Sequence, residues 1–119
     1  MANILVVDDS PTELSIIVAA LKKENHRIST AVDGEEALEK APKEMPDLIV
    51  LDIILPKKNG FQVCRQLKTA PGTKHIPIIL LSSKSQDSDR FWGLKQGADD
   101  YMTKPFDDTE LMDTISKLL

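Results

Sequence analysis

The sequence predicts an α/β fold built around a parallel β-sheet, and two observations support that prediction. Short apolar runs alternate with longer amphipathic stretches along the whole chain. Three of these runs, at residues 4–7, 48–51 and 76–81, are apolar almost without interruption, as expected for strands that are covered on both faces. Five strand–helix units in this order favour a five-stranded parallel sheet with five helices on both faces.

Length and composition indicate one domain that spans residues 1–119. Hydrophobic residues make up 41% of the chain and charged residues 29%, which is typical of a folded globular protein. The net charge of -4 gives no electrostatic support for direct DNA binding. No apolar run approaches the roughly 20 residues that a membrane span needs, and no signal peptide is visible. We therefore expect a cytoplasmic protein without membrane contact, in which the single cysteine, Cys64, is buried on a helix.

The first helix has a clear start signal after the strand at residues 4–7. Ser10 can accept a hydrogen bond at the helix N-terminus, Pro11 suits the first turn, and Glu13 has the spacing that completes a capping box. The apolar side chains that follow recur at helical spacing and form one stripe: Leu14, Ile17, Val18 and Leu21.

The remaining elements follow the same alternation. A weaker strand at residues 27–31 precedes a helix at about 34–43, and the strand at 48–51 precedes a helix at about 60–69. The strand at 76–81 precedes a helix at about 86–96, in which Phe91 and Leu94 are the expected core side chains. A weaker strand at 100–103 leads to a last helix that begins near Asp107.

Charged and hydroxyl residues stand where the predicted strands end. The first strand is followed by Asp8 and Asp9, the third by Asp52, the fourth by Ser82 and the fifth by Lys104. The carboxyl ends of parallel strands meet at one edge of the sheet, so these side chains should converge. Three carboxylates so close would repel one another, and a hard divalent cation such as Mg²⁺ would remove that conflict. With an ammonium and a hydroxyl nearby, the sequence predicts a metal-dependent site in which Asp52 accepts a phosphoryl group.

Four motifs resemble the receiver domains of bacterial two-component response regulators, which have a CheY-like, flavodoxin-like fold. They are VVDDS at residues 6–10, Leu51-Asp52 followed by Pro56 and Gly60, the segment at 77–83, and YMTKPF at 101–106. The resemblance covers essentially the whole chain and implies the strand order 2-1-3-4-5. It also implies that Asp52 takes its phosphoryl group from a sensor histidine kinase, such as a CheA-like one. Such a domain catalyses its own phosphorylation and dephosphorylation and is otherwise not an enzyme.

The resemblance assigns a magnesium site to this edge of the sheet. Asp9 is similar to the direct metal ligand of the family, and Asp8 to the second acidic residue, which often acts through water. Asp52 and the backbone carbonyl of Ile54 would complete the protein ligands. Ser82 stands where the family has a hydroxyl that contacts the phosphoryl group.

The resemblance also implies a switch and a partner surface. Lys104 matches the family's lysine, and its peptide bond to Pro105 is typically cis. Tyr101 matches an aromatic side chain that turns inward when the hydroxyl of Ser82 moves toward the phosphoryl group. The fourth helix, fifth strand and fifth helix form the surface that partners commonly use, so Trp92 and Tyr101 are expected there. Partial core packing is the alternative for Trp92.

A narrower likeness is to the stand-alone regulators of type IV pilus twitching motility, the PilH group. It lies in residues 9–13, 92–93, 96–98 and 100–105. It implies a domain without an output domain of its own, which signals to a downstream protein target as a monomer or as a phosphorylation-linked dimer.

Other functions remain open at this stage. The domain could be a phosphate sink without its own target, or a receiver that has lost phosphorylation. An aspartyl-phosphate phosphatase would carry two aspartates two positions apart, whereas Asp52 is followed by Ile53 and Ile54. A flavodoxin-like cofactor carrier would need a Ser/Thr/Gly-rich phosphate loop after the first strand, where this chain has Asp8 and Asp9 instead.

Overall fold

Strands and helices alternate five times along the computed structural model, which describes residues 2–119. The strands are β1 (Asn3–Val7), β2 (Arg27–Ala31), β3 (Leu48–Leu51), β4 (Ile78–Ser82) and β5 (Asp100–Thr103). The helices are α1 (Pro11–Lys22), α2 (Gly34–Glu44), α3 (Gly60–Thr69), α4 (Asp87–Lys95) and α5 (Asp108–Leu118). All strand pairs are parallel, in the order β2-β1-β3-β4-β5, which confirms the predicted fold class.

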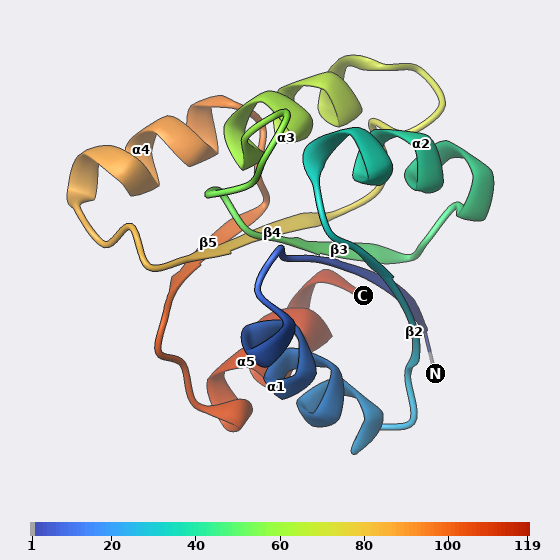
Figure 1. Cartoon of the computed structure of the whole chain (residues 1–119), viewed down its shortest axis with the longest axis vertical. Coiled ribbons are helices and arrows are strands. Elements are labelled where there is room, and N and C mark those ends of the chain that lie inside the picture. The colour runs from blue at the N-terminus through green and yellow to red at the C-terminus, as the bar shows by residue number, and fades with distance from the viewer. Residues whose placement is uncertain (1) are drawn as a thin grey trace.

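The sheet lies between two layers of helices (Figure 1). Helices α1 and α5 cover one face, and α2, α3 and α4 cover the other. Alternate residues of β1 serve the two cores, because Ile4 packs on the side of α1 and α5 while Leu5 packs on the opposite side. Both faces are covered, which explains why the central strands are apolar throughout. Cys64 on α3 is fully buried and unpaired, as predicted.

Strand β4 begins at Ile78, two residues later than its apolar run. Pro77 has no N–H to donate to a neighbouring strand, and its carbonyl accepts the N–H of Ile49 at 2.9 Å. The N–H of Ile78 bonds the side chain of Asp99 at 2.8 Å. The strand therefore begins at Ile78, which is the first residue after Pro77 and has a backbone N–H group to donate.

Helix α1 is capped by Ser10, but the predicted capping box is wrong. The hydroxyl of Ser10 accepts the N–H of Glu13 at 3.3 Å, which is half of the motif. The other half would need the N–H of Ser10, which donates instead to Asp8 Oδ1 at 2.9 Å. The carboxylate of Glu13 therefore has no role at the cap and is free to contact another group.

Helix α4 corrects a second expectation. Phe91 is 62% exposed and Leu94 is 46% exposed, so neither is a core side chain. The buried residue of this helix is Gly93, where a Cβ atom would lie 2.8 Å from a methyl group of Leu80 and 2.9 Å from the ring of Tyr101. The helix approaches the sheet through this glycine, so its larger apolar side chains point outward. Among residues 2–119, no helix is long and apolar enough to cross a membrane.

Candidate functional site

Asp8 and Asp52 meet at the carboxyl edge of the sheet because their strands are parallel neighbours in register. Val7 pairs with Leu51 across β1 and β3, so the residues that follow them lie side by side. The N–H of Asp52 donates to the carbonyl of Val7 at 3.0 Å, which continues the ladder by one residue. Both carboxylates are buried, with 1% and 7% of their residue surfaces exposed.

Lys104, which follows the edge strand β5, brings a positive charge to these two carboxylates. Its Nζ atom lies 2.7 Å from Asp8 Oδ2 and 3.3 Å from Asp52 Oδ2. Its backbone N–H donates to the carbonyl of Ser82 at 2.9 Å, which ties the segment after β5 to the end of β4. The Lys104–Pro105 peptide bond is cis.

A third carboxylate joins this site, and the sequence reasoning did not assign it. Glu13, in the first turn of α1, places Oε2 3.1 Å from Lys104 Nζ. Oxygen atoms of Asp8, Glu13 and Asp52 all lie within 4.8 Å of one another. Glu13 lies about one helical turn after Asp9, which is a spacing that could have indicated a shared site. It also lies three residues after Ser10, and that spacing predicts a capping box instead.

Burial sets the electrostatics of the site. Burial raises the pKa of Asp52, and the charge of Asp8 raises it further, while the Lys104 ammonium offsets only part of the effect. Burial alone would lower the pKa of Lys104, but the hydrogen bond to Asp8 and the charges of Asp52 and Glu13 outweigh it, so this pKa is raised. The lysine therefore stays charged, and ionisation of Asp52 costs free energy.

The two oxygens of Asp52 have different surroundings. Oδ1 accepts the N–H of Ile53 at 2.7 Å and that of Ile54 at 3.3 Å. Oδ2 faces Lys104. The side chain of Ile54 is 54% exposed at the mouth of the site. Backbone donors thus fix the orientation of the carboxylate and leave one oxygen toward the positive charge.

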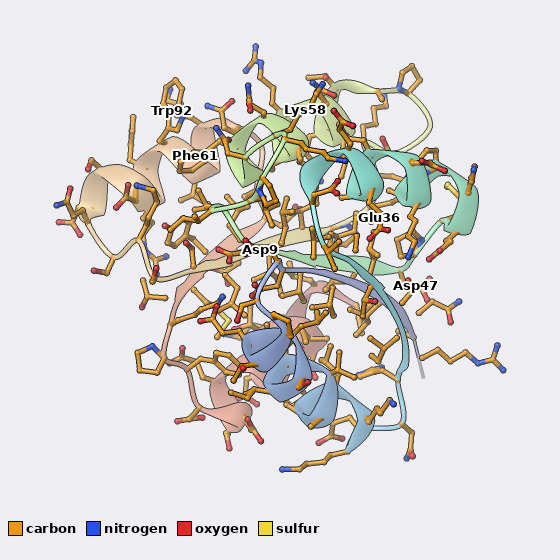
Figure 2. All side chains as sticks on the ribbon, in the orientation of Figure 1. Asp9, Glu36, Asp47, Lys58, Phe61 and Trp92 are labelled. Carbon is orange, nitrogen blue, oxygen red and sulfur yellow. The ribbon has the colours of Figure 1, made fainter. Side chains whose placement is uncertain are left out.

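Asp9 and Ser82 are not members of the group formed by the Asp8, Glu13 and Asp52 carboxylates. Asp9 lies where β1 leads into α1, and its side chain is exposed (Figure 2). It is not one of the three carboxylates that meet, so its role as the direct metal ligand stays a prediction. Ser82 is fully buried at the end of β4, and its hydroxyl accepts the N–H of Lys84 at 3.4 Å.

Tyr101 points inward in this structure, which is one of the two positions that the expected switch requires; its place on a partner surface stays a prediction. Only 1% of its surface is exposed, and its hydroxyl donates to the carbonyl of Lys84 at 2.6 Å. Burial raises the pKa of this hydroxyl to about 12. The ring fits inside because Gly93 has no Cβ atom in its way. Trp92 is 53% exposed and projects away from α4 (Figure 2), so it is not a fully buried core side chain, and its place on a partner surface stays a prediction.

The donor set of the site fits a hard divalent cation. Asp8, Glu13 and Asp52 contribute three carboxylates, and Lys104 is the ammonium that balances one of them. Oxygen atoms are the ligands that Mg²⁺ prefers, and it binds through one or two carboxylates while keeping several waters. The excess of negative charge and the all-oxygen chemistry therefore suit such an ion.

Comparison with known proteins places this architecture in a family. Residues 4–116 match the response regulator receiver domain family. The chain is 44% identical to Protein PilH of Pseudomonas aeruginosa over 119 residues, which is 100% of this chain and 98% of PilH. It is also 44% identical to the response regulator PleD of Caulobacter vibrioides, over 98% of this chain and 26% of that protein.

Solved structures with high similarity share the complete fold. A putative response regulator from Chloroflexus aurantiacus superposes with a TM-score of 0.95 at 32% identity, covering 98% of this chain and 96% of that one. The chemotaxis protein CheY4 of Vibrio cholerae gives 0.92 at 31% identity over 100% and 99% of the two chains. The receiver domain of a sensor histidine kinase from Pseudomonas aeruginosa, with a magnesium ion in its active-site cleft, gives 0.92 at 30% identity over 98% and 96%. The chain belongs to the response regulator receiver domain family.

Proposed function

We propose that this domain accepts a phosphoryl group on Asp52 from the phosphohistidine of a sensor kinase and signals by a change of its surface. The observation that carries the proposal is the placement of Lys104 Nζ 3.3 Å from Asp52 Oδ2, with Asp8 at 2.7 Å. This arrangement sets a carboxylate nucleophile beside a fixed positive charge at the edge of the sheet.

The chemistry follows from the surroundings of Asp52. A carboxylate oxygen attacks the phosphorus atom, the bond from phosphorus to the histidine nitrogen breaks, and the imidazole leaves with its electron pair and takes up a proton. The backbone N–H groups of Ile53 and Ile54 hold the carboxylate in position. Lys104 neutralises charge on the phosphoryl oxygens. The buried hydroxyl of Ser82, the last residue of β4, is a hydrogen-bond donor for the phosphoryl group.

We infer that the resident metal is Mg²⁺, held by Asp8, Asp9, Asp52 and the backbone carbonyl of Ile54. When bound, it supplies positive charge that screens the carboxylates and the incoming phosphoryl group. The acidic group at this edge supports the assignment. Asp9 is exposed and follows Asp8 directly in the chain, so it is available to a metal ion at this edge.

The surface that reads out phosphorylation is proposed to centre on α4. Trp92 and Phe91 are large apolar side chains that are more than half exposed. Tyr101 lies beneath this helix and hydrogen-bonds Lys84, two residues after Ser82. A shift of Ser82 toward a phosphoryl group would therefore be transmitted to the segment that holds the Tyr101 ring.

A small phosphodonor tests the central step. Purified protein is incubated with acetyl phosphate and MgCl₂, and its intact mass is measured. We expect a gain of one phosphoryl group in the wild type and in Asp113→Ala, which changes an exposed carboxylate on α5. Asp52→Ala should gain none. Absence of any gain in the wild type would refute the proposal, and a gain retained in Asp52→Ala would move the acceptor elsewhere.

The likeness to PilH over the whole chain supports a role in type IV pilus twitching-motility signalling, with a CheA-like kinase as donor and a cytoplasmic location. Complementation of a Pseudomonas aeruginosa strain that lacks PilH tests this role through the diameter of its twitching zone. Wild-type protein should restore the zone and Asp52→Ala should not. Restoration by neither would argue for a different pathway.

A further inference from the structure

Glu13 is the one member of the acidic group that the resemblance to receiver domains did not assign. It belongs to α1, whereas Asp8 and Asp52 follow strands. The reason it reaches the site is local. Asp8 Oδ1 takes the N–H of Ser10, so the Glu13 carboxylate has no partner at the helix cap and extends to Lys104 instead.

The Lys104 ammonium has as many N–H donors as it has carboxylate partners. An ammonium carries three N–H groups. Its three anionic neighbours are Asp8 at 2.7 Å, Glu13 at 3.1 Å and Asp52 at 3.3 Å. A phosphoryl oxygen that approaches this ammonium before transfer therefore competes with these carboxylates for it.

Exposure indicates which partner gives way. The side chains of Asp8 and Asp52 are 1% and 8% exposed, whereas that of Glu13 is 44% exposed. A carboxylate in contact with water recovers its hydration when it leaves an ion pair, while a buried one does not. Exchange of Glu13 is therefore the least costly.

Glu13 and Lys104 also share a surface cavity. It has a volume of about 490 Å³ and is lined by these two residues together with Ile16, Ile17, Ser83, Pro105 and Phe106. The other two carboxylates are not part of its lining. Glu13 is therefore the one carboxylate partner of Lys104 that has space beside it into which its side chain can move.

We propose that Glu13 is an internal competitor at the phosphoryl-acceptor site: its carboxylate pairs with Lys104, and an incoming phosphoryl oxygen displaces it from the ammonium. The proposal rests on phosphorylation of Asp52 and adds a residue that sets how readily it occurs. Removing this competitor should leave Lys104 more available to the phosphoryl group.

The test compares Glu13→Gln with a matched control. Glu110 is the equivalent first-turn residue of α5, its N–H bonds the cap residue Asp107, and its side chain is exposed. Glu110→Gln therefore removes the same charge from the same helix position away from the site. We expect Glu13→Gln to be phosphorylated by acetyl phosphate about fivefold faster than the wild type, the order expected for one nearby unit charge in a water-rich setting. Glu110→Gln should match the wild type.

Two further measurements separate contact with Lys104 from other roles. Binding of beryllofluoride, a mimic of the phosphoryl group, is followed by fluorine NMR and should tighten in Glu13→Gln by about the same factor. Glu13→Asp keeps the charge but shortens the side chain by one methylene. It should behave as Glu13→Gln if contact with Lys104 matters, and as the wild type if charge alone acts.

Several results would overturn the proposal. One is an unchanged or slower rate of phosphorylation in Glu13→Gln, and another is wild-type behaviour of Glu13→Asp. A third is a loss of Mg²⁺ affinity of about tenfold or more in Glu13→Gln, which would make Glu13 a metal ligand. A wild type that neither gains a phosphoryl group nor binds beryllofluoride would refute the proposed function itself. A wild type that does both, with variants that do not differ from it, refutes only the role of Glu13.

Discussion

Asp52 combines two properties that oppose each other in an ordinary side chain: it is a carboxylate, and it is buried. Its residue surface is 7% exposed, and Asp8 lies beside it with the same sign of charge. The Lys104 ammonium at 3.3 Å offsets only part of this cost, so the pKa of Asp52 is raised. The site thus stores unfavourable charge in the residue that is proposed to react.

This cost predicts how stability depends on pH. The folded protein binds the Asp52 proton more tightly than the unfolded chain, whose carboxyl has a pKa of 3.8. Where the folded state binds more protons, stability falls as pH rises, so the penalty grows as pH increases above 3.8 and is complete once pH exceeds the raised pKa of the folded state. We expect Asp52→Asn to unfold at a higher urea concentration than the wild type at neutral pH, and the gain to vanish below about pH 3.5.

The control for this measurement is Asp113→Asn on α5, which removes an exposed carboxylate. It should leave the urea midpoint unchanged at both pH values. A lower midpoint for Asp52→Asn at neutral pH would show that the Lys104 ion pair outweighs burial.

At the scale of elements, the start of α3 lies unusually close to the segment that follows β3. The N–H of Gly60 donates to the carbonyl of Ile53 at 2.8 Å. A Cβ atom on Gly60 would lie 2.2 Å from the carbonyl oxygen of Asp52 and 2.6 Å from the Cα atom of Ile53. These are backbone atoms, which cannot turn aside as the end of a side chain can. The absence of a side chain at Gly60 therefore allows this helix to pack against the acceptor residue.

Gly60→Ala should accordingly lower both stability and reactivity. We expect the free energy of unfolding to fall by about 1–3 kcal/mol, the usual cost of overpacking, because the backbone at Asp52 must move. Phosphorylation by acetyl phosphate should slow for the same reason. Chemical denaturation and the intact-mass assay measure the two effects.

Gly72→Ala is the matched substitution, because no atom lies within 4 Å of a Cβ placed there. It should leave stability within about 0.5 kcal/mol of the wild type, as is usual for surface changes. Equal effects of the two substitutions would show that the close approach at Gly60 is not the cause.

At the scale of the whole molecule, the site joins segments that are far apart in the sequence. Lys104 is 96 residues from Asp8 and 52 residues from Asp52 along the chain. Glu13 adds α1, so one helix layer and the sheet edge share the same group of charges. Because only the folded chain brings these carboxylates together, a cation that binds them stabilises the native state.

We therefore expect Mg²⁺ to raise the temperature of thermal unfolding relative to EDTA. At a concentration 100 times the dissociation constant, the gain in stability is about 2.7 kcal/mol for one site. Asp8→Asn should reduce the shift caused by Mg²⁺, whereas Asp113→Asn should preserve it. Equal unfolding temperatures in Mg²⁺ and EDTA for the wild type would contradict metal binding at this site.

The sequence by itself determined the fold class and the edge of the sheet where the site lies. Short apolar runs that alternate with amphipathic stretches are typical of central strands in a covered parallel sheet, and the residues that end such strands lie at one edge. Asp8, Asp52 and Lys104 were placed together on that ground, and the structure brings them into contact. Helix α1 begins where its cap residue, Ser10, predicts.

The tertiary structure decided what local patterns leave ambiguous. Glu13 fits a capping box by spacing, but competition from Asp8 for the N–H of Ser10 sends its carboxylate to Lys104. Phe91 and Leu94 fit a core stripe, but the close approach of Gly93 to the sheet turns them outward and makes room for the ring of Tyr101. The order of strands and helices along the chain and the burial of the central strands follow from repeated patterns. A partner for one side chain depends instead on which groups other segments bring within a few ångströms of it.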